Sequence, residues 1–420
     1  MYIARKIETI VLKTSVTFPV LLLTGPRQSG KTTLLRHLSE TDRKYVTLDD
    51  PDDRLFAKEQ PAAFLERYSP PVIIDEIQYA PELLSYIKIH VDKHKNNGDF
   101  WLTGSQMFHM MKNVSESLAG RVGILNLFGL SNSEITGNLF DAYTTNPQEL
   151  LKRFNETEPM TMPDIFARIH RGGMPRLYEQ PDMELGEYFA SYTQTYISRD
   201  IRELTQVADE LSFYRFLRAA AARTGSLVNY EHMARDTGIS SPTAKHWLSL
   251  LVSSGVVVLI EPYHSNVLKR VVKAPRMYFM DTGLAAHLTR WNNPEVLESG
   301  AMAGEFFETY VVSEIYKSFI NTGQIPPLFF YRDNNMREID LLIWQDGTVY
   351  PIEIKKSSNP SESARHFNAI KPIADEGRYD EMSKHLKVNI GTGNIICHAN
   401  NLRPARRSRE EIWVVPSWLI

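Results

Sequence analysis

Short, fully apolar runs alternate with helical patterns over the first third of the chain. The runs at Val20–Leu23, Val72–Ile74 and Phe100–Leu102 each lead into polar residues, and leucines recur at helical spacing after the first run. A strand buried on both faces reads as a continuous apolar run, and helices between such strands are typical of a parallel sheet. The pattern therefore predicts an α/β fold, with a parallel-sheet domain over residues 1–135.

Residues 136–290 show helical patterns for most of their length. A sharp break at Arg171–Pro175 precedes a long amphipathic helix, predicted from about Leu185 to Leu204. The tyrosines along this helix are expected to pack between domains. The middle of the chain is therefore predicted to be a helical domain.

A helix-turn-helix is predicted near the end of this middle region. A short helix, a turn at Gly238 and a second helix with serine at its cap and proline in its first turn have the required spacing. Two strands after the second helix would add a wing. The resulting winged helix would present Thr243, Lys245 and His246 on its recognition helix. The basic residues of the wing are Lys269, Arg270, Lys273 and Arg276.

The charge of the wing favours contacts with DNA phosphates. A winged helix can also dock a protein or form an oligomer contact, and that alternative stays open. A homo-oligomer is a further candidate partner, with a ring, a dimer and a monomer all allowed.

Two alternating apolar runs in the last region are joined by Asp346-Gly347, the strongest short-range signal for a hairpin. A two-residue turn then places Asp340 directly opposite Glu353. By the same register Lys355 lies opposite Glu338. The residues expected on the other side, which faces the core, are Ile339, Leu341, Ile343, Ile352 and Ile354.

Two facing carboxylates repel each other unless a cation neutralises them. Mg²⁺ takes oxygen ligands, so Asp340 and Glu353 are candidate metal ligands. The alternative is a solvated hairpin face with a single ion pair between Glu338 and Lys355.

A carboxylate followed by Glu-x-Lys resembles the metal centre of the PD-(D/E)xK nuclease superfamily, whose α/β fold is expected over residues 295–420. The resemblance implies that Asp340 and Glu353 hold Mg²⁺, which activates a water to attack a phosphodiester. Lys355 would stabilise charge or position the nucleophile. The superfamily often adds a glutamate from a preceding helix, and here Glu308 is the first choice and Glu314 the second.

The loop after the first apolar run has a complete Walker A sequence, with a strand before it and a helix after it. Its glycines let backbone N–H groups surround phosphates, and the helix N-terminus adds partial positive charge. Lys31 is expected to reach the β- and γ-phosphates, and the Thr32 hydroxyl to ligate Mg²⁺. The predicted nucleotide-binding residues of the loop are Gly25, Pro26, Arg27, Gln28, Ser29, Gly30, Lys31, Thr32 and Thr33.

The second apolar run delivers Asp75 and Glu76 to the end of a strand, as in a Walker B motif. Asp75 is expected to bind Mg²⁺ through water, and Glu76 to polarise the attacking water. A glutamate at this place argues for hydrolysis and against a kinase. After the third run, Ser105 or Gln106 is a candidate sensor of the γ-phosphate, and an ordinary helix cap is the alternative.

An arginine that contacts the γ-phosphate, in cis or from a neighbouring copy, has three candidates. Arg121 is the first, and Arg199 and Arg202 are its rivals. The alternative for each is a solvated side chain or a pair with a nearby carboxylate.

Composition fits several globular domains in a chain of 420 residues, of which 43% are hydrophobic and 23% charged. The apolar runs are too short to span a bilayer, and the first residues lack the apolar core of a signal peptide. A single cysteine, Cys397, excludes an internal disulfide framework and fits a cytoplasmic setting. The net charge of −3 gives no general affinity for nucleic acid, so any DNA surface must be local.

The order of these parts resembles one family along nearly the whole chain: prokaryotic AAA-type P-loop ATPases with a C-terminal domain of the DUF4143 type. The resemblance rests on segments that include Gly25–Thr32, Val72–Glu76, Arg171–Pro175, Gly304–Glu308 and Glu338–Lys355. It implies ATP and Mg²⁺ as cofactors, and an ATPase joined to a winged helix and a nuclease-like fold. Two functions remain: an ATP-driven enzyme that cuts DNA, and an ATPase switch that binds DNA or a protein partner without cleaving.

Overall fold

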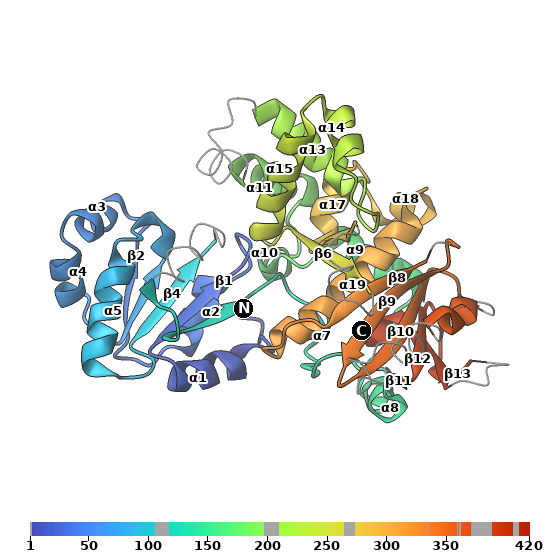
Figure 1. Cartoon of the computed structure of the whole chain (residues 1–420), viewed down its shortest axis with the longest axis horizontal. Coiled ribbons are helices and arrows are strands. Elements are labelled where there is room, and N and C mark those ends of the chain that lie inside the picture. Colours follow the sequence, from blue (N-terminus) through green and yellow to red (C-terminus); the bar gives the residue numbers. More distant parts are fainter. Residues whose placement is uncertain are drawn as a thin grey trace, which may run out of the picture.

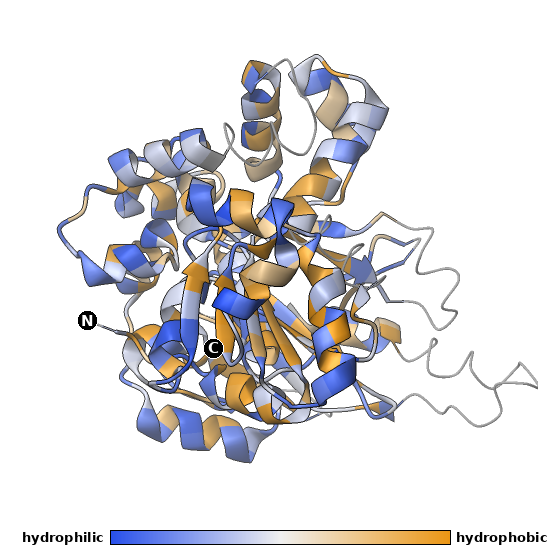
Figure 2. Cartoon of the chain, turned by 90° about the vertical axis from the view of Figure 1, so that its left-hand side faces the viewer, coloured by the Kyte–Doolittle hydropathy of each residue, from blue (hydrophilic) through white to orange (hydrophobic). Residues whose placement is uncertain are grey.

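A computed structural model describes residues 2–105, 117–196, 210–263, 274–333, 335–358, 360, 363–370, 389–405 and 411–420. Figure 1 shows a parallel sheet at the N-terminal side of the molecule, a group of helices, and a larger mixed sheet that contains the C-terminal strands. Hydrophobic residues are concentrated in the central strands, whereas the outer helices carry both kinds of residue (Figure 2). None of the helices in the described part of the chain is long and apolar enough to cross a bilayer.

The N-terminal domain is a five-stranded parallel sheet with strand order β2-β3-β4-β1-β5. This order places β4 between β1 and β3, so the carboxyl ends of these three strands lie side by side. All residues of β1, β3 and β4 are buried, as their continuous apolar sequences predict. The elements are α1 (Glu8–Thr17), β1 (Val20–Thr24), α2 (Lys31–Leu38), β2 (Lys44–Thr47), α3 (Pro51–Glu59), α4 (Pro61–Arg67), β3 (Val72–Asp75), η1 (Ile77–Tyr79), α5 (Leu83–His94), β4 (Phe100–Gly104), β5 (Val122–Asn126) and α7 (Asn132–Thr136).

The middle of the chain is helical, as predicted. Its elements are α8 (Pro147–Glu156), α9 (Met162–Arg171), α10 (Pro175–Glu179), α11 (Leu185–Tyr196), α13 (Glu210–Ala221), α14 (Tyr230–Thr237), α15 (Ser241–Ser253), β6 (Val257–Pro262), β7 (Arg276–Phe279), α17 (Thr282–Leu288) and α18 (Pro294–Ser299). Helix α14 ends at Gly238, whose φ of 72° is left-handed, and the Ser240 side chain accepts a hydrogen bond from the backbone of α15. The helix, the glycine turn and the second helix therefore lie where the sequence placed them.

The C-terminal region contains α19 (Ala303–Asn321), β8 (Leu328–Arg332), β9 (Glu338–Gln345), β10 (Thr348–Lys355), η3 (Ser363–Ile370), β11 (Asn389–Ile390), β12 (Gly393–Cys397), β13 (Arg403–Pro404), β14 (Ile412–Pro416) and η4 (Ser417–Leu419). Strands β9 and β10 form the predicted hairpin, in register from Gln345–Thr348 to Leu341–Ile352.

The alternative of a solvated hairpin face is wrong, since Asp340 and Glu353 on that face are buried. Leu341 belongs to the largest hydrophobic cluster, while Leu342 and Val349 are buried in a second cluster that includes residues of η3. Ile339, expected beside Leu341, also joins the second cluster. The register between β9 and β8 shifts at this point, which breaks the strict alternation of faces.

The larger sheet crosses the boundary expected between the middle and last domains. Strand β6 pairs with β7 on one side and, in parallel, with β8 on the other. One hydrophobic cluster also runs through the middle helices, α19 and the hairpin. The two wing strands are therefore part of the C-terminal sheet, and the middle and last regions share one core.

Candidate functional site

The turn between β1 and α2 has the backbone conformation of a phosphate-binding loop. Gly25 has a φ of 141°, and a Cβ there would lie 2.0 Å from the carbonyl oxygen of Leu127. Gly30 has a φ of 94° directly before the first residue of α2. Only glycine fits the first position and glycine is strongly preferred at the second, which is why the loop needs them.

Lys31 lies inside this loop and is 6% exposed. Its ammonium donates hydrogen bonds to the carbonyl oxygens of Gly25 at 3.0 Å and Pro26 at 2.9 Å. The side chain therefore lies against the loop, within reach of any phosphate that the loop binds.

Asp75, at the end of β3, is held by hydroxyl groups from four other residues. Thr32 and Thr103 donate to its Oδ1 at 2.6 and 2.5 Å. Tyr45 and Thr47 donate to its Oδ2, each at 3.3 Å. The sequence predicted the approach of Thr32 to Asp75, whose oxygens are ligands that suit Mg²⁺. It did not predict the three other hydroxyls, because they come from β2 and β4.

Glu76 follows Asp75 in a left-handed conformation with a φ of 58°. Its backbone N–H donates to the Thr103 hydroxyl at 3.0 Å. Its carboxylate accepts hydrogen bonds from the Gln78 amide and, at 3.4 Å, from the Ser105 hydroxyl. Ser105 thus contacts the carboxylate proposed to activate water, while its role in sensing phosphate stays a prediction.

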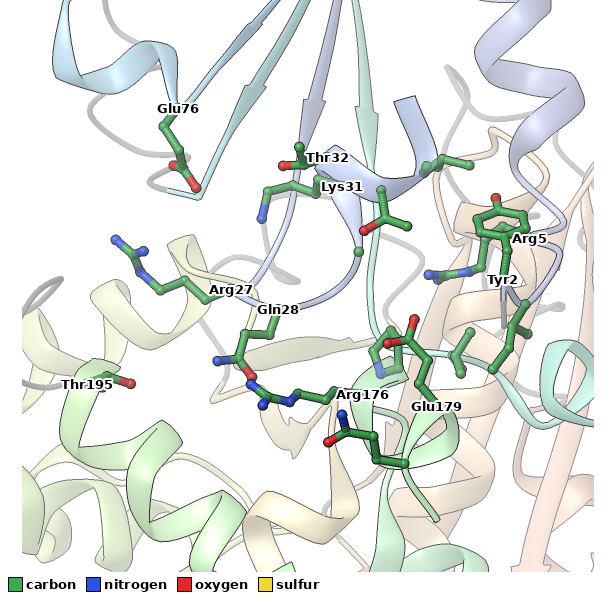
Figure 3. A pocket seen from close by; sticks show the side chains of 17 residues that line it. Tyr2, Arg5, Arg27, Gln28, Lys31, Thr32, Glu76, Arg176, Glu179 and Thr195 are labelled. Carbon is green, nitrogen blue, oxygen red and sulfur yellow. The ribbon is translucent and has the colours of Figure 1, made fainter. Parts of the chain in front are cut away.

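A cavity of about 580 Å³ lies between the N-terminal domain and the middle helices. Figure 3 shows Lys31, Thr32 and Glu76 on one wall and Arg176 and Glu179 on the opposite wall. The lining also includes Tyr2, Ile3, Arg5, Arg27, Gln28, Gly30, Thr33, Leu34, Leu130, Pro175, Gln180 and Thr195.

Arg5 is a residue of this site that the sequence analysis missed. Its guanidinium donates to the Ser29 carbonyl in the phosphate loop at 3.0 Å, to the Phe128 carbonyl at 2.8 Å and to the Glu134 carboxylate at 3.0 Å. It therefore holds the loop against the segment that leaves β5. No local pattern marks an arginine whose partners lie 24 to 129 residues away.

Arg121 cannot contact a nucleotide in cis, so that part of its assignment is wrong. Strand β5 runs parallel to β1 with Val122 beside Val20, whereas the phosphate loop follows Thr24 at the other end. Arg121 instead pairs with Asp92 on α5 at 2.6 Å. A contact with the nucleotide of a neighbouring copy stays a prediction.

Several predicted residues lie outside the described part of the chain. They are the rival arginines Arg199 and Arg202, the alternative sensor Gln106, and the wing residues Lys269, Arg270 and Lys273.

The second candidate site is the pair of carboxylates on the hairpin. The Lys355 ammonium lies 2.7 Å from the Glu353 Oε1 atom and 3.1 Å from the Asp340 Oδ2 atom. Asp340 also accepts a hydrogen bond from the backbone N–H of Ile354 at 2.9 Å. The two acidic side chains therefore converge on one lysine.

Arg276 is part of this cluster, and its predicted contact with DNA phosphates is wrong. Its side chain is 8% exposed, and its guanidinium lies 3.2 Å from Glu308, 2.9 Å from Glu338 and 3.8 Å from Asp340. A buried arginine held by three carboxylates cannot serve as a surface contact. The sequence did not indicate that Arg276 lies on β7, beside β6, which pairs in turn with β8 of the C-terminal sheet.

Glu308 lies near the carboxylate pair, but Tyr278 at 2.7 Å and Arg276 occupy its Oε1 atom. Glu314 is wrong as a second choice, because it bonds to Lys317 and to the backbone of Asn132. Within the described ranges, no three acidic, histidine or cysteine side chains are grouped closely enough to hold a metal ion. Only the pair of Asp340 and Glu353 remains as a candidate.

The raised pKa values of two carboxyl groups indicate that this cluster holds an excess of negative charge. Burial raises the pKa of Glu353 to about 8, and repulsion from Asp340 adds to the rise. Burial likewise raises the pKa of Glu308 to about 7, again with a contribution from Asp340. The Glu353 Oε2 atom is buried without a hydrogen-bond partner among the described residues. A cation between Asp340 and Glu353 would fit these observations.

Helix α15 presents the side chains expected of a recognition helix. Lys245 and His246 are exposed and Thr243 is half-buried, whereas Ala244, Trp247 and Leu248 face the core.

Models of known protein families match three segments of the chain. Residues 17–136 match an AAA domain, and residues 303–405 match a domain of unknown function, DUF4143. The chain carries an AAA domain followed by a DUF4143 domain. Between them, residues 162–295 match another domain of unknown function, DUF8612. The phosphate loop and Asp75 belong to the AAA domain, and the carboxylate pair to the DUF4143 domain.

Uncharacterized proteins of Mycobacterium tuberculosis and Mycobacterium bovis are each 27% identical to the chain over 354 residues, or 84% of this chain and 74% of theirs. Among solved structures, a Walker-type ATPase of Pyrococcus abyssi covers 68% of this chain and 96% of its own, with a TM-score of 0.43 and 16% identity. A signal transduction ATPase with a tetratricopeptide repeat sensor from Pyrococcus horikoshii covers 77% of this chain and 48% of its own, with a TM-score of 0.26 and 14% identity. These TM-scores are too low to assign a function.

Proposed function

We propose that the chain binds ATP with Mg²⁺ in the cleft of the AAA domain and hydrolyses it. The observation that carries this proposal is the convergence of Lys31, Thr32 and Glu76 on one cavity, with Asp75 hydrogen-bonded to Thr32 behind its wall. The match of residues 17–136 to an AAA domain also supports it, since the loop of such a domain would place phosphates at the N-terminus of α2.

Each residue has a role that follows from its place. Lys31 leaves the carbonyl oxygens that it now contacts and reaches the β- and γ-phosphates. Thr32 and Asp75 would hold Mg²⁺, which supplies charge neutralisation between the phosphates. Glu76 orients a water and accepts its proton as the water oxygen bonds to the γ-phosphorus. The bond to the bridging oxygen breaks, and ADP and phosphate leave.

ATP turnover by the purified chain tests this proposal. Lys31→Ala should abolish turnover, because the phosphates lose their main cationic contact, while the far-ultraviolet circular dichroism spectrum stays that of the native fold. Lys152→Ala, on the exposed face of α8, is the matched control and should turn over ATP at the native rate. Native turnover in Lys31→Ala would remove the assignment of the phosphate loop.

We further propose that the chain acts on DNA, with Asp340, Glu353 and Lys355 as a Mg²⁺-dependent centre for phosphodiester cleavage. The specific observation in favour is that two buried carboxylates share one lysine and leave one oxygen without a partner. Asp340 and Glu353 would hold the ion, and Lys355 would turn from them to the scissile phosphate. The exposed Lys245 and His246 on α15 support contacts with DNA.

Incubation of the chain with plasmid, single-stranded and branched DNA in Mg²⁺ or Mn²⁺ tests the cleavage. Products should appear with the native chain and disappear in Asp340→Asn. Products that persist unchanged in that variant would contradict the assignment of the metal centre. If no DNA is cut but DNA raises the ATPase rate, the alternative holds: an ATPase switch that binds without cleaving.

DNA binding is measured separately. Lys245→Ala should weaken the affinity several-fold and reduce the slope of log K against log salt by about one, as expected for the loss of one phosphate contact. If neither the affinity nor the slope changes, the exposed face of α15 is a site for a protein partner or for another copy.

A further inference from the structure

The tight turn before α10 carries two glycines, and the nucleotide site proposed above gives it a role. Gly173 donates its N–H to the Asp281 carboxylate at 2.8 Å, and its carbonyl accepts from the N–H of Leu130 at 2.6 Å. A Cβ on Gly173 would lie 2.5 Å from the carbonyl oxygen of Leu130. The turn is therefore packed, backbone against backbone, on the segment that leaves the AAA sheet.

Helix α10 is fixed in place by its own surroundings as well. The Arg171 guanidinium donates to the carbonyl of Leu177 at 2.8 Å, and the Tyr178 hydroxyl donates to the carbonyl of Gly172 at 2.6 Å. Pro175 begins the helix and lies 3.8 Å from the position that a Cβ on Gly30 would take. These contacts bring the first turn of α10 against the phosphate loop.

Arg176, the next residue, lines the same cavity as Lys31 and Thr32 but from the opposite wall (Figure 3). It is exposed, and its guanidinium makes no hydrogen bond or ion pair with the residues that the structure describes. Arg5, by contrast, uses its guanidinium on Ser29, Phe128 and Glu134. Arg176 is thus a cation placed at the cavity with its donors available.

We propose that Arg176 contacts the γ-phosphate of ATP in cis and stabilises the charge that develops during hydrolysis. The proposal rests on the ATPase function given above. It assigns to Arg176 the contact with the γ-phosphate that Arg121 cannot make in cis, because Arg121 lies at the other end of the sheet. As the bond from the γ-phosphorus to the bridging oxygen breaks, negative charge spreads over the γ-phosphate oxygens and the leaving oxygen of ADP. A guanidinium with two parallel N–H donors matches that geometry.

The first measurement is the steady-state ATPase rate of the full chain. Arg176→Ala should lower kcat by roughly 100-fold, a modest loss beside the ~10³-fold or greater effect of arginines that reach a γ-phosphate from outside the phosphate loop. KM should change by only a few-fold. Arg176→Lys should recover part of kcat, because it keeps the charge and loses the fork. Arg215→Ala, an exposed arginine on α13, is the matched control and should keep native kcat.

The second measurement separates a phosphate contact from a structural role. Isothermal titration with ADP and with ATPγS in Mg²⁺ should show that the native chain prefers ATPγS. Arg176→Ala should lose most of that preference while its affinity for ADP stays within about two-fold. A preference and a kcat that both remain native in Arg176→Ala would overturn the proposal.

The same titration distinguishes this inference from the function on which it rests. If the native chain binds both nucleotides but hydrolyses neither ATP nor ATPγS, the ATPase proposal fails and the preference for ATPγS still tests Arg176. If the native chain hydrolyses ATP and Arg176→Ala does so equally well, only the role of Arg176 fails.

Discussion

Glu76 has a strained backbone conformation at the candidate nucleotide site. A non-glycine residue with a φ of 58° is uncommon, and here the Thr103 hydroxyl and the side chains of Gln78 and Ser105 hold it. Its carboxylate lines the nucleotide cavity as a result. The left-handed conformation therefore directs the carboxylate into the cavity, where the proposed hydrolysis needs an attacking water.

Glu76→Gln should separate binding from hydrolysis. Glutamine keeps the shape of the side chain but cannot accept a proton, so kcat should fall by about 10²–10³-fold, a typical contribution of a general base. The affinity for ATP should stay native or rise, because a negative charge near the phosphates is lost. Single-turnover hydrolysis and equilibrium binding measure the two effects. A kcat within three-fold of native would transfer the role of base to another group.

The nucleotide-site residues differ in how far the sequence reveals them. Lys31, Thr32 and Asp75 lie in short motifs whose spacing alone places them where a strand meets a helix and at a strand end. The structure has Lys31 and Thr32 in the first turn of α2 and Asp75 at the end of β3. Thr103 and Arg5 contact the same site, but only the strand order and the path of the N-terminal segment bring them to it. Local spacing therefore predicts the motif residues, and tertiary contacts decide the rest.

At the scale of elements, the β9–β10 hairpin also combines features that local spacing predicts with features that tertiary contacts decide. Its turn and register followed from Asp346-Gly347, because a two-residue turn fixes which residues pair. What covers the hairpin did not follow, since Arg276 reaches Glu338 on β9 from β7 of the preceding region. The sequence predicted two facing carboxylates that need a cation. The structure supplies Lys355 and Arg276 as part of the answer.

The raised pKa of Glu353 predicts how stability depends on pH. Between the ordinary value of 4.5 and the folded value of about 8, the folded chain binds a proton that the unfolded chain has released. The free energy of unfolding should therefore fall as pH rises through this window. Glu353→Gln removes this titration and should be more stable than the native chain by ~5 kcal/mol at pH 8.5, at about 1.4 kcal/mol per unit of pKa shift.

Urea denaturation in EDTA, at pH 5 and at pH 8.5, measures this difference. The native chain and Glu353→Gln should be closest at pH 5 and diverge as the pH rises. Added Mg²⁺ at pH 8.5 should stabilise the native chain and leave Glu353→Gln unchanged if the ion binds at the carboxylate pair. Parallel pH curves for the two chains would show that Glu353 ionises as an ordinary surface carboxylate.

At the scale of the whole molecule, buried polar contacts join the AAA domain to the DUF4143 domain. Arg5 links the phosphate loop to Glu134. Two residues before Glu134, the backbone N–H of Asn132 donates to the Glu314 carboxylate on α19 at 2.7 Å. Lys317, also on α19, pairs with Glu314 and donates to the Leu130 carbonyl at 3.1 Å. The helix that carries Glu308 is thereby tied to the loops that support the nucleotide site.

This junction predicts a large stability effect from a single substitution far from either candidate centre. The side chains of Lys317 and Glu314 are only 4% and 6% exposed, so Glu314→Ala leaves a buried ammonium without its carboxylate. Removing one partner of a buried pair costs ~3–5 kcal/mol, whereas replacing both with apolar residues of similar size costs far less. Urea denaturation should therefore rank the double variant Glu314→Leu, Lys317→Met well above Glu314→Ala. If the two variants are equally unstable, the loss comes from packing and the hydrogen bond to Asn132, and the ion pair is not what joins the domains.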